Sequence, residues 1–94
     1  MTKRDEFVKK MKTQLDELNV EIDKLEAKFA EANETTRVRL APHLEKARKA
    51  RTAVVEKLAE LKDAGETSWD SMQAEAEHVW KTFKQSVNYF KSQL

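Results

Sequence analysis

The sequence contains no cysteine and only one glycine and one proline among its 94 residues. Without cysteine, the chain can form no disulfide and carry out no thiol chemistry, which permits the cytoplasmic location that we expect. With so few helix-breaking residues, long uninterrupted helices are expected. The scarcity of glycine and proline therefore favours an all-α fold.

Long hydrophobic runs and a strong net charge are missing as well. Nowhere do eighteen apolar residues follow one another, so no segment is expected to span a bilayer. Residues 2–6 lead into no unbroken apolar run, and no secretory signal is expected. The net charge is +1, which provides no overall field to draw the chain to nucleic acid or to a membrane.

The sequence does contain charge in abundance and a regular apolar pattern. Charged residues make up 37% of the chain, and between residues 8 and 32 apolar residues recur at spacings of three and four. This pattern is typical of a coiled-coil seam. Because a narrow seam has to be covered, it needs another helix, from this chain or from a second copy. The predicted assembly seam consists of Val8, Met11, Leu15, Leu18, Ile22, Leu25 and Phe29.

The pattern weakens between Asn33 and His43. Pro42 cannot donate a backbone hydrogen bond, and in mid-helix it costs about 3 kcal/mol. Two interpretations remain open. Either the chain turns near residues 33–41 and restarts at Pro42, or one long helix runs on with a kink. Leu40 and Leu44 favour the long helix, because they lie on the same face as the first seam.

The last segment has the most aromatic face. Gly65 and Thr67 indicate a short turn, with Thr67 as the cap of the following helix. A short connection makes the helices on its two sides antiparallel neighbours. The following apolar arc is either a bundle core, the favoured interpretation, or a face that lies on a membrane. Its principal residues are Trp69, Trp80, Phe83 and Phe90.

These observations predict one all-α domain over residues 1–94, an antiparallel coiled coil or helical bundle. Its three helical segments are expected at about 3–33, 42–63 and 67–93, the first two alternatively joined as one long kinked helix. In that alternative the seam has no partner within the chain, and a homo-oligomer follows. A compact bundle would instead be self-sufficient.

The sequence offers no recognisable catalytic centre, and we expect no enzyme, no cofactor and no metal. There is no glycine-rich phosphate loop, and the serines have no recognisable base. Glu75 and His78 have the Glu-x-x-His spacing of di-iron bundles, but His78 lies opposite the apolar arc. The basic residues between Arg37 and Arg51 have no interleaved aromatics, which indicates solvated helix surface and makes nucleic-acid binding unlikely.

Three stretches resemble a known family. Residues 3–18 with their continuation 21–28, residues 58–70 with the Gly-Glu-Thr-Ser-Trp turn, and the tail Asn-Tyr-Phe-Lys-Ser-Gln-Leu at 88–94 are similar to small bacterial coiled-coil proteins, some labelled stress-response proteins. The resemblance covers about half of the chain and departs at Pro42. It implies an all-helical protein without catalytic residues and suggests a role in stress.

Our functional hypothesis is a non-catalytic structural or interaction protein that works through helix–helix contacts, with a second copy or another protein as partner. The alternative is a peripheral membrane or lipid-binding protein that uses Trp69, Trp80, Phe83 and Phe90. Blue-shifted tryptophan emission in the absence of lipid would indicate the core, and a shift seen only with anionic vesicles would indicate the membrane.

Overall fold

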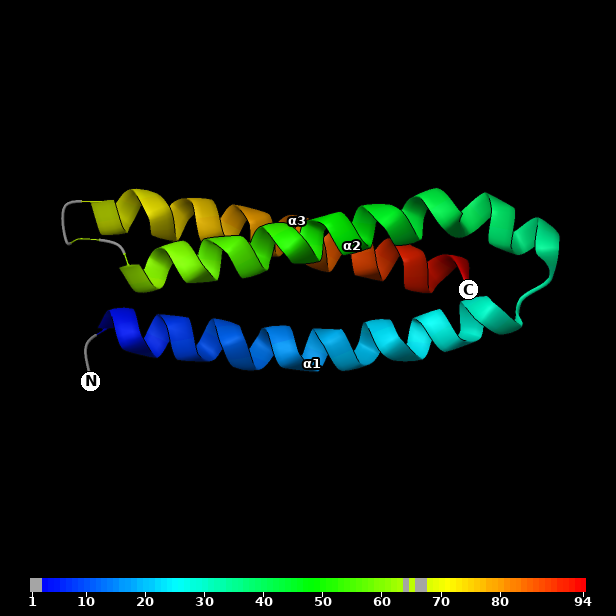
Figure 1. The fold of residues 1–94 in the computed structure, drawn as a ribbon, viewed down its shortest axis with the longest axis horizontal. Coiled ribbons are helices and arrows are strands. Elements are labelled where there is room, and N and C mark those ends of the chain that lie inside the picture. Colours follow the sequence, from blue (N-terminus) through cyan, green and yellow to red (C-terminus); the bar gives the residue numbers. More distant parts are fainter. Residues whose placement is uncertain (1–2, 64, 66–67) are drawn as a thin grey trace.

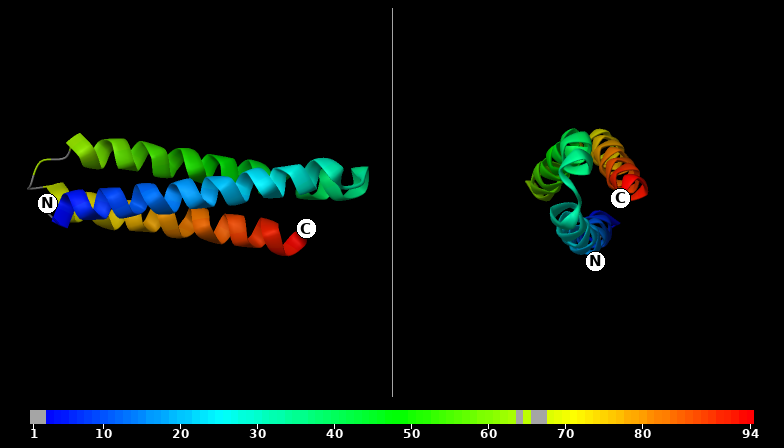
Figure 2. Two further views of the ribbon diagram at one scale, coloured as in Figure 1. Left: turned by 90° about the horizontal axis from the view of Figure 1, so that it is seen from below. Right: turned by 90° about the vertical axis from the view of Figure 1, so that its right-hand side faces the viewer.

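The computed structural model describes residues 3–63, 65 and 68–94, and this part of the chain forms three helices (Figure 1). They are α1 (Lys3–Glu31), α2 (Glu34–Asp63) and α3 (Trp69–Gln93). The helices run side by side in alternating directions, in a bundle 50 Å long and 20 by 17 Å across. Seen end-on, they stand at the corners of a triangle (Figure 2). The predicted all-α antiparallel bundle is confirmed.

α1 follows directly from its sequence. Strong helix formers fill it, and the apolar residues at spacings of three and four form one stripe. Asp5 and Glu6 lie in its first turn and Lys28 in its last. These charges have the sign that the helix dipole favours at each end.

The joint between α1 and α2 is a turn of two residues, Ala32 and Asn33. The Asn33 side chain caps α2, since its Oδ1 accepts a hydrogen bond from the Thr36 backbone N–H at 2.8 Å. The Asn33 carbonyl oxygen accepts a second from the Arg37 N–H at 3.0 Å. An asparagine cap satisfies donors that otherwise have no partner at a helix start. The first two segments are therefore separate helices in the chain.

The predicted start of the second segment at Pro42 is wrong, because α2 begins eight residues earlier, at Glu34. Pro42 lies inside the helix, and α2 bends in its first turns (Figure 1). Leu40 is fully buried and Leu44 is 5% exposed. Their packing on either side of the proline offsets the hydrogen bond that proline cannot donate. Val38, in the same stretch of α2, is 70% exposed and so does not add to this packing.

Residues 64–68 connect α2 to α3. The predicted cap, Thr67, lies outside the described residues. The backbone N–H of Ser68 donates to the Gly65 carbonyl at 3.3 Å, and α3 begins at Trp69 with Asp70 in its first turn. α2 and α3 are thus antiparallel neighbours, as the short connection predicted (Figure 1).

The core lies between the three helices and is entirely apolar among the described residues. Its largest fully buried side chains are Phe83 and Phe90 of α3, Ile22 of α1, and Leu40 and Leu61 of α2. The packing around this core is unequal, because α2 and α3 contact each other much more closely than either contacts α1. The molecule is therefore a tight α2–α3 hairpin to which α1 is added as a third helix.

Candidate interaction site

The predicted assembly seam is part of the chain's own core. Four of its members are buried in the structure, and the other three are partly buried and pack against that core. α2 and α3 together provide the partner helices that the seam requires. The sequence required a homo-oligomer only if the seam had no partner within the chain. Because α2 and α3 supply that partner, a homo-oligomer is not required, and the oligomeric state stays a prediction. The buried members are Met11, Leu15, Ile22 and Leu25, and the partly buried members are Val8, Leu18 and Phe29.

The predicted aromatic face of α3 also points inward. Phe83 is fully buried and Phe90 is 2% exposed, while Trp69 and Trp80 are partly buried against the core. The Trp80 and Phe83 rings lie edge to face with centroids 5.9 Å apart. Phe90 meets Phe29 of α1 at 6.0 Å between centroids. Phe83 and Phe90 are therefore packed against protein, whereas Trp69 and Trp80 keep part of their surface exposed.

The surface is hollowed at the end of the bundle where α1 begins, α2 ends and α3 begins. This hollow has a volume of about 920 Å³. Lysines surround it, and Val8 and Trp69 supply apolar surface. We call it the lysine groove. Its cationic residues are Lys3, Arg4, Lys9 and Lys12 from α1 and Lys62 from α2, and its carboxylates are Asp5 and Asp70.

Arg4 fixes the geometry of the lysine groove. One guanidinium nitrogen, Nη2, donates to the carbonyl oxygens of Leu61 and Lys62, each at 2.9 Å. These carbonyls belong to the last turn of α2, where acceptors have no partner within the helix and the dipole favours a cation. The guanidinium also lies over the Trp69 ring, 5.7 Å from its centroid. Arg4 therefore links the three helices at this end of the bundle.

Trp69 is held from a second side as well. Phe7 of α1 contacts its ring edge to face, with centroids 5.8 Å apart. The tryptophan is thus anchored between α1 and α3 while part of it stays exposed in the groove. Aromatic pairs of this geometry add to the stabilisation that burial alone provides.

A second, smaller hollow of about 380 Å³ lies between α1 and α2. It shares Val8, Lys12 and Lys62 with the lysine groove, so the two are contiguous. Its apolar lining includes Val55, which is 49% exposed, and Ala59. An apolar strip thus continues from the lysine groove along the α1–α2 face, and the carboxylates Asp16 and Asp63 also line this second hollow.

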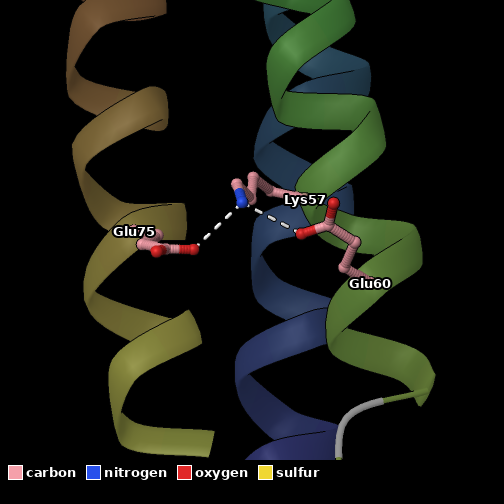
Figure 3. Close-up of polar contacts among 3 residues, drawn as sticks. All are labelled: Lys57, Glu60 and Glu75. Carbon is pink, nitrogen blue, oxygen red and sulfur yellow. Dashed lines mark hydrogen bonds and ion pairs between the residues drawn. The ribbon is translucent and has the colours of Figure 1, made fainter. Parts of the chain in front are cut away.

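Ion pairs connect the helices elsewhere on the surface. Lys57 of α2 donates to Glu75 of α3 at 2.9 Å and to Glu60 of its own helix at 3.0 Å (Figure 3). These interactions raise the pKa of the Lys57 ammonium above its ordinary value of 10.5, the hydrogen bond to Glu75 most and that to Glu60 next. Both carboxylates stabilise the charged form, so the cluster bridges α2 and α3 while the lysine is protonated.

α1 is held to the other helices by two further pairs. Arg48 Nε of α2 lies 3.2 Å from a Glu26 carboxylate oxygen, and Lys91 Nζ of α3 lies 2.9 Å from one of Glu21. All four side chains retain substantial exposure. Such pairs contribute at most about 1 kcal/mol each. Together they orient α1 more than they stabilise it.

The basic residues between Arg37 and Arg51 do not form one surface. Arg48 pairs with Glu26, Arg39 donates to Gln93 Oε1, and Arg37 donates to the Ala30 carbonyl. They point to different neighbours around α2, as expected for solvated helix surface.

Glu75 and His78 are not brought together with further ligands. Glu75 binds Lys57, and His78 is exposed. Within the described residues, no group of three or more His, Cys, Asp or Glu side chains is placed to hold a metal ion. No described helix has the length and apolar character needed to cross a membrane.

Sequence reasoning missed the lysine groove. Lys9 and Lys12 are three residues apart, which places them on one side of α1, and this spacing was available as a signal. Lys62 and Trp69 join them only because α1 packs beside the end of α2 and the start of α3. No pattern along the chain records that docking.

The chain matches no protein-family model, no curated protein and no solved structure. Its description therefore comes from its own fold, an antiparallel three-helix bundle, and from the charged groove on its surface.

Proposed function

We propose that the chain is a non-catalytic interaction protein whose lysine groove binds an acidic amphipathic helix of another protein. The observation that carries this proposal is the combination of cations and apolar surface in one hollow. Lys3, Lys9, Lys12 and Lys62 suit a carboxylate-rich partner. The apolar strip from Val8 toward Val55 suits the apolar stripe of a helix, which lies in such a groove in many helix-in-groove complexes.

The burial of the seam supports a surface of this kind. Its side chains already pack against α2 and α3, so a partner that used them would first have to unfold α1. The groove needs no such rearrangement. A partner can reach it on the closed bundle, which keeps the cost of association low.

Charge reversal on α1 tests the proposal. The probe is a fluorescein-labelled amphipathic peptide with leucines at spacings of three and four and glutamates on both flanks. We expect Lys9→Glu with Lys12→Glu to weaken its binding by about tenfold or more at low salt, measured by fluorescence anisotropy.

The matched control is Lys10→Glu with Lys24→Glu. Both are exposed on α1 and neither lines either of the two hollows described above, while the net charge changes equally. This variant should bind the peptide nearly as the unchanged chain does. If both double variants weaken binding to the same extent, only overall charge matters and the groove proposal fails.

A second candidate is lipid binding through the aromatic face of α3. It is favoured by one observation, the less close packing of α1 on the α2–α3 hairpin. Phe83 and Phe90 would meet a bilayer only after α1 had moved away. Tryptophan emission that shifts to the blue only with anionic vesicles would support this candidate, and emission already blue-shifted in buffer and unchanged by vesicles would contradict it.

We extend this proposal to a role in stress tolerance. The basis is the family resemblance of residues 3–18, 21–28, 58–70 and 88–94. A cytoplasmic location also belongs to the proposal, and the absence of cysteine permits that location. Both are separate from the binding experiment, which tests the groove alone.

A further inference from the structure

The joint between α1 and α2 is short and contains no helix breaker. Only Ala32 and Asn33 separate the last residue of α1 from the first of α2. Alanine is the best helix former, and asparagine is acceptable within a helix. Phe29, Leu40 and Leu44 fall on one side of a cylinder at 100° per residue, so a continuous helix through the joint would keep one apolar stripe.

Helix ends leave backbone groups without intrahelical partners. In the closed chain, the end of α1 and the start of α2 are satisfied by local bonds. Ala32 N–H donates to the Phe29 carbonyl, Asn33 caps the N–H of Thr36, and Arg37 reaches back to the Ala30 carbonyl. If residues 30–36 continued as helix, the carbonyls of α1 would instead accept from the N–H groups of α2. A continuous helix through the joint would therefore satisfy the same backbone groups.

The contacts that hold α1 in place do not depend on the joint. They run from α1 side chains to α2 and α3: Arg4 to Leu61 and Lys62, Phe7 to Trp69, Glu21 to Lys91, Glu26 to Arg48, and Phe29 to Phe90. α1 from a second copy, lying in the same place and direction, would make the same contacts. Exchange would therefore preserve the whole interface of α1.

α1 is also the helix whose release from the bundle should cost the least free energy. It packs less closely than α2 and α3 pack together. The Oδ1 atom of Asn19, on α1, is buried without a hydrogen-bond partner among the described residues. A buried acceptor without a partner weakens the packing of the helix that carries it. Releasing α1 returns that group to water.

We propose that two copies of this chain exchange α1, with residues 3–63 of each forming one continuous helix. The first half of each long helix then packs against the α2–α3 hairpin of the other copy. The exchange forms a closed two-fold dimer, and because no interface is lost, its population depends on protein concentration. In the dimer each lysine groove combines Lys9 and Lys12 of one copy with Lys62 and Trp69 of the other. The inference does not depend on what the groove binds.

Two substitutions at the joint move the proposed equilibrium in opposite directions. Glu34 is the first helical residue of α2, where proline is well tolerated, so Glu34→Pro preserves the closed bundle. In a continuous helix the same proline would lie in the interior, and we expect the Kd of the dimer to rise by about four orders of magnitude, since both copies are affected. Asn33→Ala removes the cap that only the closed form uses. It should lower the Kd by about thirtyfold.

Light scattering over a range of concentrations measures these changes. The mass of the unchanged chain and of Asn33→Ala should rise toward twice the chain mass, with the Asn33→Ala variant rising first, and Glu34→Pro should keep the mass of one chain. Circular dichroism confirms that each variant is folded. A single-chain mass for Asn33→Ala at every concentration would overturn the proposal, as would a dimer that persists in Glu34→Pro.

Cross-linking distinguishes exchange from simple side-by-side association and keeps the native joint. Because the chain has no cysteine, Glu26→Cys and Arg48→Cys can be made in separate chains, mixed in denaturant, refolded together and treated with a short bis-maleimide. Exchange places residue 26 of one copy beside residue 48 of the other, so the mixture should give a cross-linked pair. Each variant alone is the control and should give none. A dimer whose mixture does not cross-link is not an exchanged dimer.

Discussion

At the scale of single residues, a few polar side chains determine how the helices are placed relative to one another. Arg4 joins the start of α1 to the end of α2 and to Trp69 of α3. Lys57 joins α2 to α3 through Glu75. Arg4 and Lys57 therefore each contact residues that are distant in the sequence. Side chains of this kind set the register of an apolar bundle whose stripes alone would tolerate sliding.

Lys57 gives a pH-dependent prediction. Its pKa is raised in the folded protein, so its contribution to stability is fully present below pH 10.5 and is lost as the pH rises through the raised pKa. We therefore expect the unfolding free energy of the unchanged chain to fall more steeply above pH 10.5 than that of Lys57→Gln. Urea unfolding followed by circular dichroism between pH 9 and pH 12 measures the difference.

Lys49→Gln is the control, since it removes a lysine that is exposed on the same helix. It should follow the unchanged chain across the whole range. A gap between the unchanged chain and Lys57→Gln that stays constant with pH would show that the hydrogen bonds to Glu75 and Glu60 do not favour the charged lysine.

At the scale of elements, α2 shows how packing overrides a local preference. Pro42 interrupts the backbone hydrogen bonds of a helix that nevertheless extends from Glu34 to Asp63. The helix persists because Asn33 caps its start and because Leu40 and Leu44 are buried on both sides of the proline. Periodicity identified those leucines correctly. It did not show that their packing outweighs the cost of the proline.

Replacing the proline tests this account. Pro42 is exposed, so Pro42→Ala leaves the core unchanged, restores a backbone donor and removes the steric clash. We expect the free energy of unfolding to rise by about 1–3 kcal/mol, measured by urea denaturation. Lys46→Ala, one turn further along α2 and also exposed, is the control. It shows how much stability alanine adds through its helix propensity when no proline is removed. An unchanged or lowered stability for Pro42→Ala would contradict the prediction.

At the scale of the whole molecule, the closed bundle gives the seam of α1 a partner within the chain. Leu25 is 4% exposed and Leu18 is partly buried against the same core. Two aspartates there would place charges among apolar side chains of all three helices. Leu18→Asp with Leu25→Asp should therefore unfold the chain, with a loss of more than about 4 kcal/mol. Circular dichroism and its thermal transition measure the loss.

Val20→Asp with Ala27→Asp is the matched control. It introduces the same two charges at the same spacing on α1, but both positions are exposed, and Val20 is 54% exposed. This control should remain folded. Equal stability of the two double variants would mean that the seam is not part of a core that the chain itself forms.

Local sequence patterns predicted three helical segments and the faces that they bury, and left open whether the first two are joined in one helix. Spacings of three and four placed Leu15, Ile22 and Leu25 on one stripe and Phe83 and Phe90 on another, because helical geometry is local and repeats along the chain. The same local reasoning could not place the start of α2. The cap at Asn33 competes with the proline at Pro42, and the burial of Leu40 decides between them.

Long-range packing determines which helices cover the seam and which side chains remain on the surface. Whether α1 packs against its own α2–α3 hairpin depends on the balance between two bonding patterns at Ala32 and Asn33, because the long-range contacts of α1 are the same in both arrangements. The lysine groove also depends on where α1 is placed. Lys9 and Lys62 are distant in the sequence and meet because α1 lies antiparallel to α2. Local periodicity specifies a helix and its apolar face, but the relative placement of helices is a property of the packed whole.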